Sequence, residues 1–186
     1  MAAVLAPTLV STLWPAQSGG SRATRNLLLA LVGTLALMVS AKTQIPFWPV
    51  PMTMQTFVVL VIGMAYGARL GVATIALYLL EGALGLPVFA GTPEKGVGLA
   101  YMMGPTGGYL LGFVAADWLC GWLAERGFDR SPLRTLAAIS LGHALIFVFG
   151  VTWLAQLIGF EKAFATGVVP FWAATIAKTL LGVVTL

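Results

Sequence analysis

Long apolar runs alternate along this chain with short breaks rich in glycine, proline and charge, and this pattern predicts membrane-spanning helices. The runs occupy six segments, at residues 26–41, 54–66, 70–86, 106–123, 133–157 and 167–186. The second segment, about 20 Å long at the helical rise, is short for a bilayer crossing and by length alone fits a re-entrant segment. We count it as a span because the loops on its two sides carry opposite topological signals. The predicted fold is an all-α membrane protein, a bundle of six transmembrane helices.

The composition indicates that lipid surrounds this bundle. Hydrophobic residues make up 59% of the chain and charged residues 9%, with a mean hydropathy of +0.96; a soluble domain usually carries about 25% charged residues. The length allows one bundle, at 26–186, preceded by a cytoplasmic or interfacial segment at 1–25. A weak apolar patch at 4–13 has no basic stretch ahead of it, which argues against a signal peptide.

Basic residues divide between the predicted loops by type, and this sets the orientation. With the N-terminus in the cytoplasm, the inner loops contain Arg22, Arg25, Arg69, Arg126, Arg130 and Arg134, and the outer loops contain Lys42, Lys95 and Lys162. The excess on the inner side follows the positive-inside rule. With an even number of spans, both termini are then cytoplasmic. The net charge of +4 is thus a topology signal and does not suggest a nucleic-acid partner.

Small residues at a spacing of four recur in the spans and predict close helix packing. The pairs are Ala36 with Ser40, Gly63 with Gly67, and Gly108 with Gly112. Packing within the bundle is one interpretation. The alternative is that the first span offers Ala36 and Ser40 to another subunit.

Several kinds of chemistry find no support in the residues. Cys120 is the single cysteine, so an intramolecular disulfide is excluded. One histidine without clustered carboxylates argues against a metal site, and no nucleophile–base pair is evident for catalysis. We expect neither a cofactor nor an enzymatic activity.

Three unusual stretches carry a family resemblance: SAKTQIPFWPVPMTMQT at 40–56, AYGARLGVATIALYLLEGALGLPVFAG at 65–91 and GPTGGYLLGF at 104–113. Over about residues 27–186 the chain resembles the BioY family, the biotin-specific substrate-binding (S) subunits of energy-coupling-factor (ECF) vitamin transporters. The resemblance implies an ECF S-component fold in the bacterial inner membrane and high-affinity biotin capture at the outer face. It also implies vitamin uptake with a transmembrane coupling (T) subunit and two ATPase subunits. Because the chain has no GxxxxGK[ST] loop, any ATP must be hydrolysed by a partner.

The first outer loop, at 42–56, is a candidate lid over a biotin pocket. Its prolines restrict the backbone and remove hydrogen-bond donors, so the loop is stiff and loses little entropy on closing. Gln55 and Thr56 begin the second span, where an amide and a hydroxyl suit the ureido group. Phe47 and Trp48 would cover the apolar face of the ligand. The alternative is an interfacial aromatic belt with a capped helix start.

The second outer loop, at 85–109, is long for a hydrophobic hairpin and ends in a glycine-rich helix start. Backbone N–H groups at Gly107 and Gly108 suit the ligand carboxylate, and Tyr109 adds a hydroxyl. Lys95 is a rival partner for the carboxylate.

Three ionisable residues fall inside the spans, where burial of charge is costly: Glu81, Asp117 and Lys178. In the family, the segment matching PFWAATIAK at 170–178 has an aspartate three residues before the lysine, and both are associated with biotin binding. Here the lysine is kept but Thr175 replaces the aspartate. Since Asp117 and Lys178 are predicted to lie at similar depth, we expect them to form an ion pair. The alternative is that Lys178 meets the ligand carboxylate directly.

His143 stands where the family has an asparagine. It would exchange a hydrogen bond with the ligand, or alternatively bond a carbonyl of a neighbouring helix. These departures leave open a divergent paralogue with an altered ligand. Two further alternatives are a self-sufficient homo-oligomeric facilitator without the ATPase subunits, and an intramembrane enzyme using Asp117 and His143.

Overall fold

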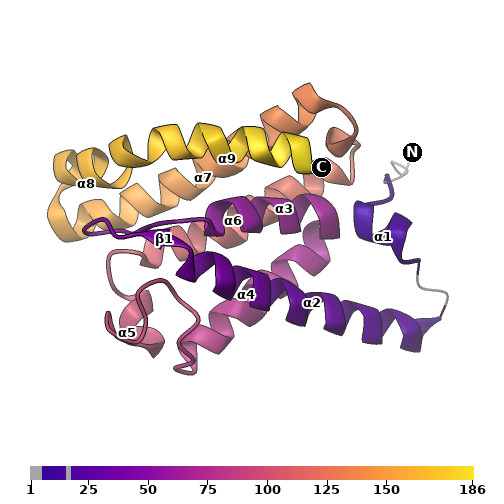
Figure 1. The fold of residues 1–186 in the computed structure, drawn as a ribbon, viewed down its shortest axis with the longest axis horizontal. Helices are drawn as coiled ribbons and strands as arrows, with labels where there is room; N and C mark the ends of the chain where they lie inside the picture. The colour runs from indigo at the N-terminus through magenta and orange to yellow at the C-terminus, as the bar shows by residue number, and fades with distance from the viewer. Residues whose placement is uncertain (1–5, 16–17) are drawn as a thin grey trace.

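The computed structural model describes residues 6–15 and 18–186, and this part of the chain is mostly helical (Figure 1). In chain order, its elements are α1 (Leu9–Leu13), α2 (Gly19–Lys42), β1 (Gln44–Ile45), β2 (Met52–Thr53), α3 (Gln55–Tyr66), α4 (Ala68–Ala83), α5 (Gly98–Met102), α6 (Gly107–Ala124), η1 (Phe128–Arg130), α7 (Pro132–Ile158), α8 (Phe160–Gly167), η2 (Val169–Phe171) and α9 (Trp172–Thr185). Each apolar segment predicted from the sequence lies largely within one of the longer helices, α2, α3, α4, α6, α7 and α9.

Length and composition make four helical stretches capable of crossing a membrane: α2, α6, α7 and the stretch from α8 through α9. Helix α3 is apolar but shorter. The last stretch is broken at η2, where Pro170 removes a backbone donor and interrupts a continuous α-helix. The last predicted segment, at 167–186, is therefore a helix only from Trp172 onwards.

Helix α6 forms the centre of the bundle and packs against α3, α4 and α7. Glycines make these approaches close. A Cβ added at Gly108 would collide with Trp153 of α7, and one at Gly112 would lie 2.9 Å from the Cα of Ile146. One at Gly63 of α3 would lie 2.6 Å from the carbonyl oxygen of Asp117. Backbones that meet at glycine pack without intervening side chains, and the helix faces fit tightly.

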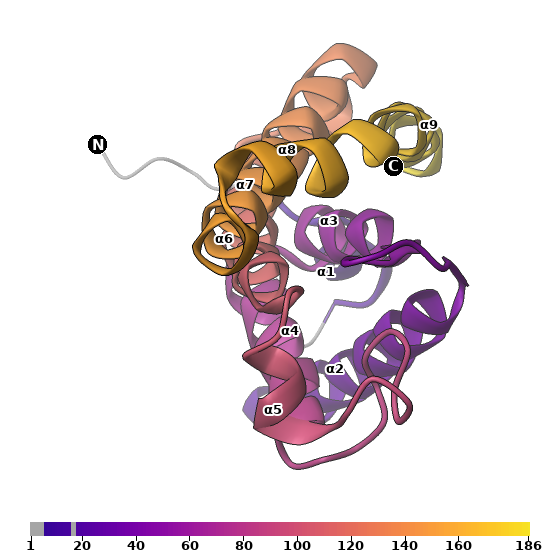
Figure 2. The ribbon, with the colours of Figure 1, turned by 90° about the vertical axis from the view of Figure 1, so that its left-hand side faces the viewer.

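The stretch at 42–56 forms a hairpin. Strands β1 and β2 pair antiparallel, with Gln44 opposite Thr53 and Ile45 opposite Met52. Its prolines fall in the turn between the strands, since proline cannot donate to a strand ladder. Figure 2 looks onto this end of the bundle and shows the hairpin lying between α9 and α2.

Lys42 ties this hairpin to the second outer loop. At the end of α2, its Nζ donates to the carbonyl oxygens of Phe89 (3.0 Å) and Thr92 (2.8 Å), and to the Thr92 hydroxyl at 3.0 Å. The two loops that were predicted separately therefore form one connected structure at this end of the bundle.

The small face of α2 is turned into the chain. Ser40 is buried and donates to the carbonyl of Leu37, Ala36 is half-buried, and a Cβ at Gly33 would meet the side chain of Thr74 on α4. The prediction that Ala36 and Ser40 together face another subunit is corrected here, because Ser40 packs within this chain. The residues that α2 exposes are large and apolar, such as Leu31 and Leu35.

The N-terminal segment lies against the opposite end of the bundle. The backbone N–H of Ala6 donates to the carbonyl of Glu125 at 2.7 Å, and the carboxylate of Glu125 accepts from the N–H of Ala68 at 3.0 Å. Helix α2 begins at Gly19, so residues 19–25 belong to the first long helix and not to a separate segment at 1–25. Residues 1–5 and 16–17 of that segment lie outside the described residues.

Candidate functional site

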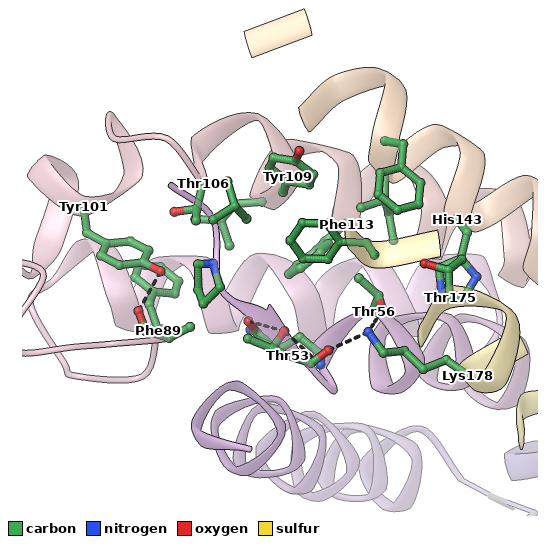
Figure 3. A pocket seen from close by; sticks show the side chains of 18 residues that line it. Thr53, Thr56, Phe89, Tyr101, Thr106, Tyr109, Phe113, His143, Thr175 and Lys178 are labelled. Carbon is green, nitrogen blue, oxygen red and sulfur yellow. Dashed lines mark hydrogen bonds between the residues drawn. The ribbon is translucent and has the colours of Figure 1, made fainter. Parts of the chain in front are cut away.

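A cavity lies at the end of the bundle that carries the hairpin (Figure 3). The hairpin, the second outer loop, α3, α6, α7, η2 and α9 contribute to its wall. The residues are Val50, Pro51 and Thr53 of the hairpin; Gln55 and Thr56 of α3; Phe89, Ala90, Tyr101 and Thr106 of the second outer loop; Tyr109, Leu110 and Phe113 of α6; His143, Ile146 and Phe147 of α7; and Phe171, Thr175 and Lys178 of η2 and α9. The wall consists mostly of apolar and aromatic side chains with a few polar groups among them, as is usual for a small-molecule site.

Lys178 is the one cation in this wall, and the hairpin holds it in place. Its side chain is 7% exposed. Its Nζ donates to the carbonyl of Thr53 at 2.7 Å and to the hydroxyl of Thr56 at 3.2 Å. An ammonium group has three protons, so one N–H remains for a ligand.

The predicted ion pair between Asp117 and Lys178 does not form. The Asp117 side chain is completely buried, packs against Gly71 of α4, and has no hydrogen-bond partner for either carboxyl oxygen within residues 6–15 and 18–186. Similar depth does not bring the groups together, because Lys178 is directed to the hairpin carbonyl of Thr53. Asp117 is not part of the cavity wall.

Gln55 is fixed by a chain of hydrogen bonds that runs into the second outer loop. Its Nε2 donates to the hydroxyl of Tyr78 at 2.7 Å, and that hydroxyl donates to the carbonyl of Val88 at 2.9 Å. The Thr53 hydroxyl accepts from the backbone N–H of Gln55 at 3.2 Å. As predicted, α3 begins at Gln55, and both Gln55 and Thr56 reach the cavity.

Aromatic rings form much of the remaining wall. Phe89 stacks on Tyr101 with ring centroids 4.9 Å apart, and the edge of Tyr78 meets Phe89 at 5.4 Å. The Tyr101 hydroxyl donates to the carbonyl of Ala90 at 2.8 Å, and burial raises the pKa of this hydroxyl. Phe89, Tyr101, Phe113 and Phe171 were not singled out from the sequence. The long second loop was the signal that pointed towards the first two.

The predicted aromatic cover lies outside the cavity wall. Trp48 is 78% exposed. Phe47 does not line the cavity but packs against the wall residue Phe171, with ring centroids 6.2 Å apart. Gly107 and Gly108 also lie outside the wall, packed against Met102 and Trp153. From the start of α6, the residues that line the cavity are Thr106 and Tyr109. The Tyr109 hydroxyl donates to the carbonyl of Gly167 at 3.0 Å.

His143 and Thr175 lie together at the Lys178 end of the cavity, whereas Tyr101 lies at the far end (Figure 3). His143 is buried, and its Nδ1 is 3.1 Å from the hydroxyl of Thr179 on α9. The ring therefore has the Thr179 hydroxyl of the neighbouring helix as a partner, and the backbone of Ile139 on α7 also bonds it. Nε2 of the ring has no partner within the described chain.

Lys95 is exposed and lines a second hollow beside the cavity, which shares Pro51, Tyr101 and Thr106 with it. No Asp or Glu lines the main cavity. The described residues also contain no group of His, Cys, Asp and Glu that could hold a metal ion. The site can thus hold an apolar body with one hydrogen-bond acceptor near Lys178 and an anionic tail near Lys95.

The chain is similar to known proteins in both sequence and fold. The model of the BioY family matches residues 10–186. A probable biotin transporter BioY of Pyrococcus horikoshii is 38% identical over 146 residues, covering 78% of this chain and 84% of the relative. The biotin transporter BioY of Thermotoga maritima is 39% identical over 148 residues, covering 79% and 85%. The fold is similar to the crystal structure of the S-component for biotin from an ECF-type ABC transporter, with a TM-score of 0.78, 23% identity and coverage of 91% and 92%.

Proposed function

The chain belongs to the BioY family, and from this premise we propose that it is a biotin-binding S subunit of an ECF-type vitamin transporter. The observation that carries the proposal is the cavity, in which aromatic walls surround one anchored cation. Relatives that match most of this chain are named biotin transporters, and none of those names denotes an enzyme. The resemblance noted from the sequence is confirmed as a family relationship.

Biotin combines a fused bicyclic ring, a ureido group and a valerate chain. Each of these parts can be matched to side chains in or beside the cavity. We place the ureido group at the Lys178 end, where the remaining N–H of Lys178 donates to the ureido oxygen. Phe113 and Phe171 then pack against the rings. The carboxylate extends to Thr106 and the neighbouring hollow of Lys95. In the alternative orientation, Lys178 contacts the carboxylate, and biotin amide then binds far more weakly than biotin.

The hairpin of β1 and β2 serves as the lid. It holds Lys178 through Thr53, and it is tied to the second loop through Lys42. Movement of the hairpin therefore opens the cavity and releases the cation in one step. Trp48 is exposed in the turn of this lid. There it contacts lipid, or it contacts the ligand once the lid has closed.

We place the protein in the bacterial inner membrane with α2, α3, α4, α6, α7 and α9 as six spans. Figure 1 shows the hairpin, α5 and α8 gathered at one end and both termini at the other. The lysines predicted for the outer side lie in or beside the first group of elements, at Lys42, Lys95 and Lys162. This arrangement favours an outward-facing cavity, a cytoplasmic N-terminal segment, and a spanning domain that follows it.

Uptake would then require a T subunit and two ATPase subunits, with the outward face of α2 as the docking surface. A homo-oligomeric facilitator remains the second candidate for transport. Loss of uptake in cells that lack the coupling and ATPase genes supports the first, whereas unchanged uptake supports the second.

Titration of the purified protein with biotin in a calorimeter tests the binding function. We expect saturable binding near one ligand per chain. Thr175→Asp introduces a carboxylate into the wall and separates two explanations of a negative result. If only the variant binds, the natural ligand differs from biotin at that group. Failure of both proteins would reject a biotin site.

A further inference from the structure

One nitrogen of His143, a residue of the cavity wall, is buried and left without a partner within the described chain. His143 is 3% exposed, and its Nδ1 lies 3.1 Å from the Thr179 hydroxyl. Its Nε2 has no hydrogen bond with any described residue. An unpaired buried polar atom lowers the stability of the fold. A ligand group that forms a hydrogen bond with this nitrogen would remove that cost.

The hydrogen bonds of Thr179 decide which ring nitrogen carries the proton. The Thr179 hydroxyl donates to the carbonyl of Thr175 at 2.8 Å. A hydroxyl has one hydrogen to donate, so towards His143 the same oxygen can only accept. Nδ1 therefore carries the hydrogen, and the bonds run from His143 through Thr179 to Thr175. In the neutral ring, Nε2 is left as a hydrogen-bond acceptor.

The remaining wall makes such an acceptor important. Lys178 offers an N–H, and no carboxylate lines the cavity to receive one from the ligand. A donor and an acceptor at the same end of the cavity suit a group that carries a carbonyl beside an N–H. A cyclic urea is such a group.

We propose that Nε2 of His143 accepts an N–H of the ligand's ureido ring and is a specificity-determining residue of this site. The inference rests on the proposed biotin function and adds a residue to it. Lys178 and His143 together distinguish a urea from rings that have the same shape but lack the N–H. Thr179 is a positioning residue, which acts by fixing the tautomer of His143.

The chain contains a single histidine, so a nitrogen NMR spectrum of protein labelled only at histidine reports this ring alone. The protein is purified without a polyhistidine tag. In the free protein we expect a protonated Nδ1 and an unprotonated Nε2. Saturating biotin should shift the Nε2 resonance and leave Nδ1 nearly unchanged. The opposite tautomer, or a silent Nε2 while calorimetry shows bound biotin, would overturn the inference.

Variants provide the second test. His143→Gln places an amide oxygen near the position of Nε2, whereas His143→Leu removes the acceptor. We expect His143→Leu to weaken biotin binding about 10- to 100-fold and His143→Gln to stay within several-fold of the wild type. Thr179→Val, the matched control for the bond at Nδ1, should cause a smaller loss and a mixture of tautomers. Thermal midpoints in detergent show whether each variant is folded.

Biotin analogues methylated at one or the other ureido nitrogen complete the design. Wild-type protein should discriminate against one of them about 10- to 100-fold, and His143→Leu should lose that discrimination. Equal discrimination in both proteins would assign the N–H to a different acceptor. Absence of biotin binding by the wild type is a separate outcome, which rejects the proposed function and with it the ligand contact.

Discussion

The ammonium group of Lys178 lies 2.7 Å from the carbonyl oxygen of Thr53, across 125 residues of sequence. The contact joins the last helix to the hairpin that lines the cavity. Because the same Nζ would bind the ligand and the Thr53 carbonyl, a ligand that contacts Lys178 also affects the position of the hairpin.

Replacement of Lys178 by methionine tests this double role. The substitution keeps much of the side-chain length but removes the donors, so we expect biotin binding to weaken at least about 10-fold. Amide hydrogen exchange in the hairpin should also become faster. Lys162→Met, at an exposed lysine of α8, is the control and should leave both measurements unchanged. An unaltered dissociation constant for Lys178→Met would exclude a direct contact with the ligand.

Replacement of Lys42 by methionine should loosen the two outer loops from one another. Three hydrogen bonds to Phe89 and Thr92 are lost. Because Lys42 is partly in contact with solvent, the expected loss of stability is about 1 kcal/mol. The main effect is expected in the rate of biotin dissociation, measured by release of radiolabelled ligand. If release is not accelerated, closure of the cavity does not depend on the connection between the loops.

Tyr78→Phe should damage the site without touching the ligand. The change leaves Nε2 of Gln55 and the carbonyl of Val88 without their buried partner. We expect a loss of about 1–3 kcal/mol in stability, together with weaker biotin binding as Gln55 reorients. Tyr66→Phe, which removes a hydroxyl bonded to the carbonyl of Leu29 on α2, is a control away from the cavity. Thermal unfolding and calorimetry of both variants give the comparison.

Gly71→Ala should destabilise the bundle, because a Cβ at this position would collide with the carboxyl group of Asp117. Overpacking of this kind costs about 1–3 kcal/mol. Asp117→Ala in the Gly71→Ala background makes room and should recover part of the loss, which a double-mutant cycle measures. Additive effects of the two changes would show that these side chains do not compete for space.

The sequence predicts where the helices lie more reliably than how they face. Apolar runs and glycine or proline breaks depend on neighbouring residues, so the segment at 133–157 and the helix start at Gln55 are found from them alone. The rotation of a helix about its axis depends on the elements packed around it. Asp117 and Lys178 therefore lie at comparable predicted depths yet face different surroundings, and Ser40 faces inward.

Loop contacts are harder still to predict. Lys42 reads as an ordinary outer-loop charge, and its bonds to Phe89 and Thr92 depend on the path of the second loop. The candidate residues Gln55, Thr56, Tyr109, His143, Thr175 and Lys178 do reach one cavity. The family resemblance located the last three, while the aromatic walls required the folded chain.

The layer beneath the cavity limits how the contents can leave. Ala116, Asp117 and Cys120 have no exposed surface, and α6 meets α3 at Gly63 and the start of α4 at Gly121 with almost no space between the backbones. The described bundle is therefore shaped like a cup with a solid floor. A cup of this kind cannot pass its cargo straight through along its axis. Anything that the cavity binds must therefore leave through its mouth or through an opening in the side of the bundle.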